Sequence, residues 1–398
     1  MNPSERTAWI RERAITIGFD LCGVANLADI APLRELGNLT EWLGRGYAGE
    51  MKYLHDPRRA DPQQVVPGAR SAIVVGLNYN TEHPYSTDAA AQAAAADPDK
   101  QPTGWISRYA WGDDYHEVLG ERLETLVAAM RVEFASAQDE PFGARAYVDT
   151  GPVSERVLAK YAGLGWLAKN TCLINEKIGS WIFLGTIITT FELAPTFRPD
   201  EPPPSDLCGN CRLCLDACPT QAFPEPYVLD ATRCISYLTI ELRGTIPEEL
   251  RPAMGRAVVG CEICQDVCPW NRKAPVTRLA AFQPRRITSV AARRGSNDES
   301  EASLLEPSLE WLASLTQEEF SRVFRGSAVK RAKWRGVVRN ACIALGNSHL
   351  PRNSVVGQRV LMLLSRLADS DDTVIADHAR WAIAQLALQS PLVGGAHL

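Results

Sequence analysis

The sequence predicts three successive parts: an α/β or α+β domain, a cysteine-rich domain and an all-α region. Three observations predict this order. Strand-like and helix-like segments alternate up to about residue 195, eight of the eleven cysteines lie between residues 208 and 268, and the last hundred residues have a helical pattern. We expect the three domains to span residues 1–200, 201–280 and 281–398.

In the first domain, residues 4–17 have the pattern of an amphipathic helix, and residues 71–79 that of a buried strand. Residues 105–134 predict a polar aromatic turn that leads into a long amphipathic helix. Strand-like segments follow at 144–149 and 180–190, and Ser154 is a candidate cap for the helix between them.

Four prolines between residues 197 and 204 predict a stiff linker after the first domain. Near the C-terminus, RNACIAL at 339–345 and RWAIAQL at 380–386 share Arg, Ala and Leu at an offset of 41 residues. That period suits helical-hairpin repeats of the HEAT type. We therefore expect an all-α, HEAT-like C-terminal region.

Composition restricts the class of protein. A hydrophobic fraction of 45% and a charged fraction of 22% are those of a soluble globular chain. The net charge of −5 argues against a nucleic-acid-coating protein, although it allows a local basic patch. We find neither a signal sequence nor a membrane-spanning stretch, so we expect a cytoplasmic protein with no membrane partner, and a monomer as the simplest state.

The cysteines form two runs. CGNCRLCLDACPT at 208–220 has the spacing CxxCxxCxxxCP, and CEICQDVCPWN at 261–271 has the spacing CxxCxxxCP. A structural zinc site is one interpretation, with four thiolates in a closed tetrahedron. The first run, however, is typical of bacterial ferredoxins, in which three close thiolates hold one [4Fe-4S] cluster and the fourth ligand comes from elsewhere.

In two-cluster ferredoxins the last cysteine of each run serves the other cluster. The second run has Val258 where its first cysteine would stand, and Cys234 is the natural substitute. We therefore predict two [4Fe-4S] clusters with crossed ligation, one held by Cys208, Cys211, Cys214 and Cys268, and the other by Cys218, Cys234, Cys261 and Cys264. Cys22 and Cys342 are predicted to fill the core, and packing is also favoured for Cys172.

Two clusters only relay electrons, so the first domain is expected to carry the electron acceptor's site. A flavin, a nicotinamide and a corrinoid all remain open on redox grounds. The nucleotide fingerprint GxGxxG is absent, and residue spacing alone does not identify the cofactor.

The segments YVDTGPVSER, AGLGWLAKNTCLIN and GSWIFLGTIIT, together with the two cysteine runs, closely resemble the epoxyqueuosine reductase family. The resemblance extends over most of residues 10–345. It implies a base-off cobalamin in the first domain, an electron donor that is not identified, and the reduction of epoxyqueuosine to queuosine at the wobble position of tRNA anticodons.

The resemblance also implies site residues. Asp149 matches the family's proton donor, and a carboxyl group beside a corrin is expected to have a raised pKa; the alternative is an aspartate that forms a turn or caps a helix. The expected cobalamin contacts are Arg59, Ser107, Asp149, Leu173, Asn175 and Leu184. His116 is expected to be structural, because the resemblance implies no histidine below the cobalt.

An acidic chain that acts on tRNA needs a local basic surface. Residues 325–339 contain six basic residues and no acid, and residues 283–294 contain four more. They could contact phosphates, or be ordinary solvated charges. Two other functions stay open from the sequence, a corrinoid reductive dehalogenase and a non-catalytic ferredoxin-type electron carrier. Cobalamin binding would separate the carrier from the enzymes, and the accepted substrate would separate the two enzymes.

Overall fold

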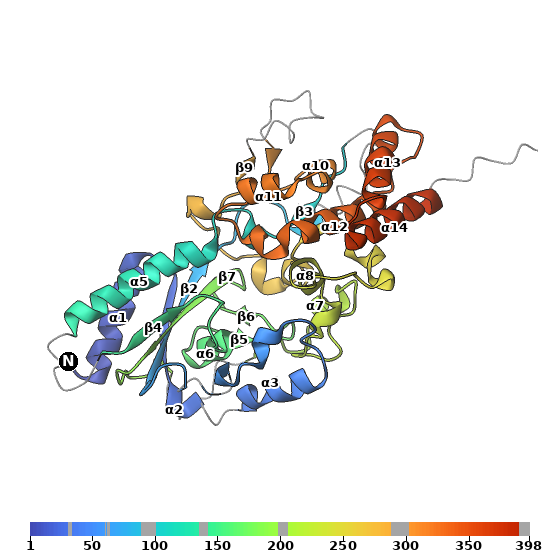
Figure 1. The fold of residues 1–398 in the computed structure, drawn as a ribbon. Coiled ribbons are helices and arrows are strands. Elements are labelled where there is room, and N and C mark those ends of the chain that lie inside the picture. The colour runs from blue at the N-terminus through green and yellow to red at the C-terminus, as the bar shows by residue number, and fades with distance from the viewer. Residues whose placement is uncertain are drawn as a thin grey trace, which may run out of the picture.

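The structure is a computed structural model that describes residues 1–30, 34–59, 61, 64–88, 101–134, 142–197, 206–287 and 302–389. Most of the predicted proline-rich linker and residues 288–294 of the second basic stretch lie outside the described residues. Figure 1 shows a lobe built around a sheet, with the cysteine-rich segment beside it and the C-terminal helices beyond.

The sheet of the first lobe has four strands in the order β1-β2-β7-β4. The strands are β1 (Leu21–Asn26), β2 (Ser71–Asn78), β7 (Ile182–Thr189) and β4 (Ala144–Tyr147). The three strands predicted at 71–79, 144–149 and 180–190 are confirmed. All neighbours are antiparallel, so the lobe is of the α+β kind.

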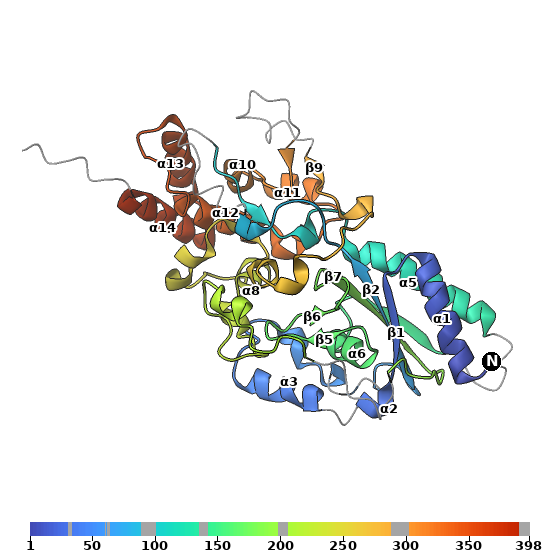
Figure 2. The same cartoon turned by 180° about the vertical axis from the view of Figure 1, so that it is seen from behind.

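Helices cover both faces of this sheet (Figures 1 and 2). Helices α1 (Pro3–Ile17) and α5 (Tyr115–Glu133), both predicted, pack on the face that carries Ile73, Val75 and Leu77. Helices α2 (Leu27–Ile30) and α6 (Glu155–Tyr161) pack on the face that carries Ala72 and Val74. Side chains alternate between faces along a strand, which is why one apolar run serves both layers.

The predicted cap of α6 is wrong. Ser154 stands at the N-cap position but makes no capping hydrogen bond. Its hydroxyl instead donates to the carbonyl oxygen of Arg59 at 3.2 Å, because the loop before α6 packs against the segment around residue 59. Helix α1 has a real capping box, formed by Asn2 and Glu5.

The cysteine-rich segment consists of short elements, and the C-terminal region is mainly helical. The first lobe also contains the short pair β5 (Trp166–Leu167) and β6 (Leu173–Ile174). The elements of the cysteine-rich segment are α7 (Leu213–Asp216), α8 (Ile235–Ile240), β8 (Ala257–Val259) and α9 (Ile263–Asp266). Those that follow are β9 (Arg286–Ile287), β10 (Ala302–Ser303), α10 (Leu309–Ala313), α11 (Gln317–Val323), α12 (Lys333–Gly346), α13 (Val355–Ala368) and α14 (Thr373–Gln389). The similar segments 339–345 and 380–386 lie on α12 and α14, which pack against each other. That these helices form HEAT repeats stays a prediction.

One hydrophobic core joins the predicted second and third domains. It runs from Ala231 to Leu386 and takes in Trp105 and Ile106 of β3 (Trp105–Ile106), which pairs in parallel with β8. The core therefore does not divide at residue 280, and the three domain ranges stay a prediction. Within the part of the chain that is described, no helix has both the length and the apolar character needed to cross a bilayer.

Candidate active site

The structure gathers the eight clustered cysteines into two sets of thiols. The pKa of the Cys214 thiol is raised to about 11. Burial is the larger cause, and the nearby sulfurs of Cys268, Cys208 and Cys211 add to it. Burial and the sulfurs of Cys234 and Cys218 likewise raise the pKa of Cys261. The outer set is Cys208, Cys211, Cys214 and Cys268, and the inner set is Cys218, Cys234, Cys261 and Cys264.

Each set contains cysteines of both runs. Among the described residues, however, no group of three or more cysteine, histidine or acidic side chains is arranged to hold a metal ion, so the crossed ligand assignment stays a prediction. Cys268, from the second run, lies with the first three cysteines of the first run. Cys218, from the first run, lies with Cys234 and Cys261. Helices α7 and α9, which follow the two runs, pack against each other and bring the runs together. That the sets hold clusters stays a prediction at this point.

Two residues of the first lobe touch the thiol sets. Trp166 is 3% exposed, its indole N–H has no hydrogen-bond partner, and its ring packs in a small buried cluster against Cys208. The Cys172 thiol hydrogen-bonds Cys264 of the inner set, which lowers the pKa of Cys172. Cys172 therefore does more than fill the core, whereas Cys342 is fully buried in α12 as predicted.

Asp149 follows β4 in a left-handed conformation, with φ of 57°. Continuing the register of β4 with β7 puts it level with Leu184. Its carboxylate accepts a hydrogen bond from the Tyr115 hydroxyl at 2.9 Å, and the His116 Nε2 atom lies 3.8 Å from the same oxygen. Its backbone N–H donates to Glu155 Oε1 at 2.9 Å, which fixes the loop.

The raised pKa expected for Asp149 is not found. Burial acts to raise the pKa, but the nearby imidazole of His116 and the hydrogen bond from Tyr115 outweigh it and leave the pKa below its ordinary value. The side chain is also 66% exposed, so water still reaches the carboxylate. Without a partner over this open side, Asp149 is ionised at neutral pH.

The neighbours of Asp149 hold the protons instead. Burial alone would lower the pKa of His116, but hydrogen bonds to Asp114 and Asp149 raise it to about 9. Burial, and then the charge of Asp149, raises the pKa of Glu155 to about 8. At pH 7 the site therefore contains an imidazolium and a protonated Glu155 next to an aspartate.

Three of the residues expected at the cofactor are Arg59, Leu184 and Leu173, and of these Arg59 contacts the loop that follows Asp149. Arg59 donates to the Val153 carbonyl oxygen at 3.2 Å and lies over the Tyr53 ring at 5.7 Å. Leu184 is partly buried in β7, and Leu173 is 4% exposed beneath α6.

The other two expected residues are placed differently. Ser107 is fully buried, its hydroxyl has no hydrogen-bond partner, and a Cβ atom on Gly260 would come within 2.4 Å of it. It lies beside the inner thiol set. Asn175 bonds Gly179 through both its backbone groups, and its side-chain amide donates to the Leu164 carbonyl oxygen at 2.7 Å.

The helical region also borders the site. Arg331 pairs with Glu241 at 2.8 Å and lies 5.5 Å from the centre of the Tyr53 ring. The charges of Glu241, Arg331 and Asp149 all act on the Tyr53 hydroxyl, whose pKa burial raises. Side chains from all three predicted domains therefore face one another around Asp149.

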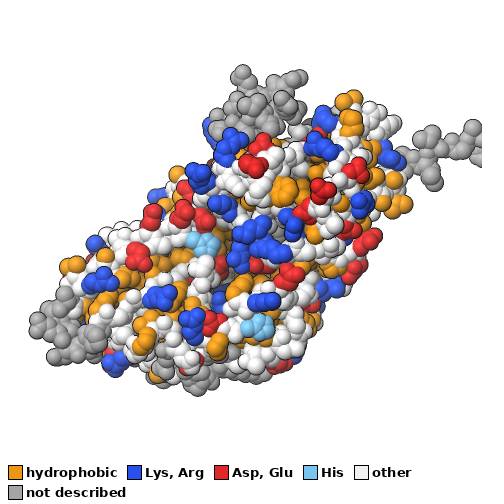
Figure 3. All heavy atoms as spheres, viewed as in Figure 1, with side chains coloured by type: hydrophobic (Ala, Val, Ile, Leu, Met, Phe, Trp, Pro, Cys, Tyr) orange, Lys and Arg blue, Asp and Glu red, His pale blue; other side chains and the backbone are white. Residues whose placement is uncertain are grey.

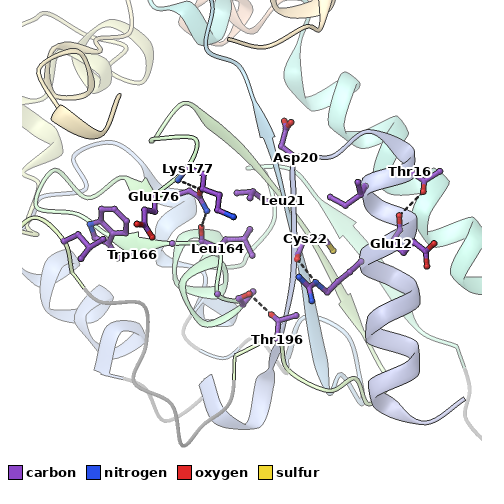
Figure 4. Close-up of a pocket in the computed structure, with 17 residues that line it drawn as sticks. Glu12, Thr16, Asp20, Leu21, Cys22, Leu164, Trp166, Glu176, Lys177 and Thr196 are labelled. Carbon is purple, nitrogen blue, oxygen red and sulfur yellow. Dashed lines mark hydrogen bonds between the residues drawn. The ribbon is translucent and has the colours of Figure 1, made fainter. Parts of the chain in front are cut away.

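A separate hollow of about 1050 Å³ lies at the edge strand β1 and does not include Asp149. Figure 4 shows its walls, with Glu12 and Thr16 of α1 on one side and Trp166 on the other. Asn175 and Leu207 also line it. The hollow therefore borders the outer thiol set, whereas the acid–base group around Asp149 lies on an open surface.

Sequence patterns did not reveal Tyr115, Glu155, Arg156 or Trp166 as site residues. Tyr115 and His116 stand together at the start of α5, and Tyr115 stacks on Phe183 with ring centroids 4.4 Å apart. A pair of ring side chains directly after an acidic cap was the available signal. Glu155 and Arg156 begin a helix directly after the Asp149 loop, and no sequence pattern marked them as site residues.

The fold and the two thiol sets define an iron–sulfur protein with an acid–base site. A family described as "4Fe-4S double cluster binding domain" matches residues 207–271, and one described as "Epoxyqueuosine reductase QueG, DUF1730" matches residues 59–150. The first match supports iron–sulfur clusters over structural zinc.

Whole-chain comparisons agree. The epoxyqueuosine reductase of Gloeobacter violaceus is 43% identical over 86% of this chain and 96% of its own, and that of Pseudomonas aeruginosa is 37% identical over 96% and 95%. A crystal structure of epoxyqueuosine reductase with an epoxyqueuosine-modified tRNA-Tyr stem loop has a TM-score of 0.77 at 28% identity, covering 97% of this chain and 91% of that one. The chain belongs to the epoxyqueuosine reductase family.

Proposed function

We propose that this protein reduces epoxyqueuosine to queuosine at the wobble position of a tRNA anticodon, with electrons that pass from the outer to the inner cluster. The observation that carries the proposal is the short connection from the inner thiol set to Asp149 through Cys172 and Arg156. Arg156 donates to the Thr171 carbonyl oxygen at 2.6 Å and acts electrostatically on both Asp149 and Cys172, which bonds Cys264.

The proposed cluster ligands are the two thiol sets, and the proposed organic cofactor is a base-off cobalamin above Asp149. The residues present suit such a cofactor. His116 Nδ1 lies 2.7 Å from Asp114 and the ring is protonated at neutral pH, so this histidine has no lone pair for cobalt. Arg59 contacts the loop that follows Asp149, and Leu173, Leu184, Asn175 and Ser107 are proposed as further cofactor contacts. When bound, cobalamin would supply a strong nucleophile and reductant for the strained epoxide carbon.

The chain's own residues handle the protons. Conversion of an epoxide into an alkene takes two electrons and two protons and releases the oxygen as water. Asp149 lies between two hydrogen-bond donors, Tyr115 and His116, and is the carboxylate most open to a ligand. We infer that Asp149 delivers the proton to the epoxide oxygen and is resupplied by the His116 imidazolium. A bound cofactor that excluded water would raise the pKa of Asp149 toward that role.

The pH dependence of turnover tests this proton supply. The pKa of His116 is raised to about 9, so the ring is protonated below that pH and loses its proton above it. We expect kcat to be steady near pH 7 and to fall as the pH rises through about 9. In His116→Gln that alkaline fall should disappear and kcat at pH 7 should drop by about 10²-fold. An unchanged alkaline limb in the variant would remove His116 from the proton path.

The tRNA would lie across the basic side of the helical region, where Figure 3 shows Lys and Arg side chains gathered near the middle of one face. Arg325, Lys330, Arg331, Lys333 and Arg335 are exposed. Arg339, the sixth basic residue of the stretch 325–339, does not belong to this surface. It is 1% exposed and donates to the carbonyl oxygens of Leu238, Leu242 and Gly244. Arg285, in the second basic stretch, forms an ion pair with Asp113 at 2.7 Å.

Lys330 and Lys333 are the basic residues of this face for which we expect a phosphate-binding role. The double variant Lys330→Ala/Lys333→Ala should bind a tRNA stem loop about tenfold more weakly, and the slope of log affinity against log salt should fall by about 2. Arg13→Ala, which removes an exposed charge from α1, is the matched control and should bind as the unaltered protein does. Equal salt slopes in all three proteins would contradict the placement.

The function itself is tested with an anticodon stem loop that carries epoxyqueuosine, incubated with the cluster- and cobalamin-loaded protein and a chemical reductant. Mass spectrometry of the nucleosides should show loss of one oxygen atom. Failure to convert this substrate, with clusters and corrin shown to be bound, would contradict the proposal.

A further inference from the structure

The outer thiol set lies at the surface, and its surroundings are unlike the rest of that surface. Leu207, Leu213 and Tyr227 are 42%, 46% and 46% exposed. Leu207 and Leu213 belong to the chain that carries Cys208, Cys211 and Cys214. Tyr227 reaches the same place, since its hydroxyl bonds Asp206 and its backbone N–H donates to the Lys169 carbonyl oxygen at 2.9 Å. These three residues form one apolar patch.

A rim of basic residues flanks this patch. Lys169 donates to the carbonyl oxygens of Gly209 and Cys211, the latter at 3.0 Å, so its charge lies against the outer loop. Arg272 and Lys273 are exposed just after Trp270, whose ring centroid is 5.0 Å from that of Trp166. Lys177 is exposed in the turn before Gly179, and that turn packs against Trp270 and Asn271.

Four acidic residues lie on this surface and three of them are paired, among them Glu225, two residues before Tyr227, which pairs with Arg45 at 3.1 Å. Asp206 accepts a hydrogen bond from Tyr227, and Asp216 pairs with Arg212 at 3.3 Å. Glu176 is exposed beside Lys177. The patch is therefore apolar at its centre and positive at its rim, on a chain whose net charge is −5.

The inner thiol set is not placed to receive electrons directly from a partner protein. Cys234 and Cys261 of the inner set pack against the large hydrophobic core, and Cys172, which lies next to Cys264, connects the inner set inward toward the Asp149 site. The buried indole of Trp166 packs against Cys208 of the outer set, beneath the patch. Electrons from outside therefore have their shortest way in at the outer set.

We propose that Leu207, Leu213 and Tyr227, with the rim of Lys169, Lys177, Arg272 and Lys273, are the docking surface for a small acidic electron-carrier protein that exposes its redox centre. The inference rests on the proposed function, for which it names the partner class and the place of entry. Apolar contact at the centre and opposite charge at the rim are what a brief electron-transfer encounter uses.

Anaerobic stopped-flow reduction tests the docking surface without any tRNA. Oxidised, cluster-loaded protein is mixed with chemically reduced flavodoxin as the probe, and the bleaching of cluster absorbance is followed against flavodoxin concentration. We expect a saturable rate that weakens with salt. Leu213→Glu and the pair Arg272→Glu/Lys273→Glu should each raise the half-saturating concentration about tenfold, because one loses the apolar centre and the other reverses the rim charge.

Controls separate docking from cluster damage. Bleaching by dithionite should be unchanged in both variants, and Val132→Glu, which alters an apolar side chain 80% exposed on α5, should behave as the unaltered protein. If Leu213→Glu loses iron, the double variant Arg272→Glu/Lys273→Glu alone tests the docking surface. The docking proposal is wrong if both variants keep the original concentration dependence, if Val132→Glu is impaired equally, or if flavodoxin reduces the unaltered clusters without saturation. Because the substrate is absent, a failure of epoxyqueuosine reduction would not alter these outcomes.

Discussion

Asp149→Asn is expected to lower kcat for epoxyqueuosine reduction by about 10²- to 10⁴-fold, the range for loss of a general acid. The amide keeps the shape of the carboxylate and can still accept from Tyr115, but it cannot take a proton from His116 and pass it on. Cluster absorbance and tRNA stem-loop affinity should be unchanged, because neither the thiol sets nor the basic residues contact Asp149. Single-turnover conversion of the stem loop is the measurement.

Asp113→Asn is the matched control for this variant. Asp113 stands near the start of α5 as Asp114 does, but its carboxylate pairs with Arg285. We expect turnover within about twofold of the unaltered protein, since surface substitutions away from a site have small effects. Full activity in Asp149→Asn would mean that the proton comes from another group, with Glu155 the next candidate because its pKa is raised to about 8.

Cys268→Ala is expected to abolish the outer cluster and with it all turnover that depends on an external electron donor. The iron content should fall from about eight to about four per chain, because a cubane left with three thiolates is lost. Crossed ligation makes a sharper prediction. The electron paramagnetic resonance spectrum of reduced Cys268→Ala should match that of Cys211→Ala, from the other run, and differ from that of Cys264→Ala, four residues away in its own run.

Cys22→Ala is the control for these cysteine variants, since Cys22 lies in β1 outside both thiol sets. It should retain about eight irons. If the spectrum of Cys268→Ala instead matched that of Cys264→Ala, each run would hold its own cluster, and the relay from the outer to the inner set would have to be redrawn.

The sequence predicted the parts of this protein that depend on local pattern. Three strands of the sheet and helices α1 and α5 follow from alternation and amphipathicity, whereas the two ligand sets inferred from cysteine spacing stay a prediction. These features depend on residues close together in the chain or on fixed rules of cluster ligation.

What the sequence did not predict depends on contacts between distant segments. Serine is a residue type that favours the N-cap position, yet the Ser154 hydroxyl donates to the Arg59 carbonyl oxygen. Arg339 sits in a basic run, yet it is the buried partner of three carbonyl groups near residue 240. The lowered pKa of Asp149 comes from Tyr115 and His116, more than thirty residues earlier in the chain.

The most direct test of the whole account is a metal and cofactor inventory of protein purified without oxygen and then incubated with cobalamin. We predict about eight irons with matching sulfide and one tightly held corrin per chain, with no axial nitrogen from the protein on the cobalt. Zinc in place of iron, or iron without any corrin retained, would contradict the proposal that two clusters supply electrons to a cofactor above Asp149.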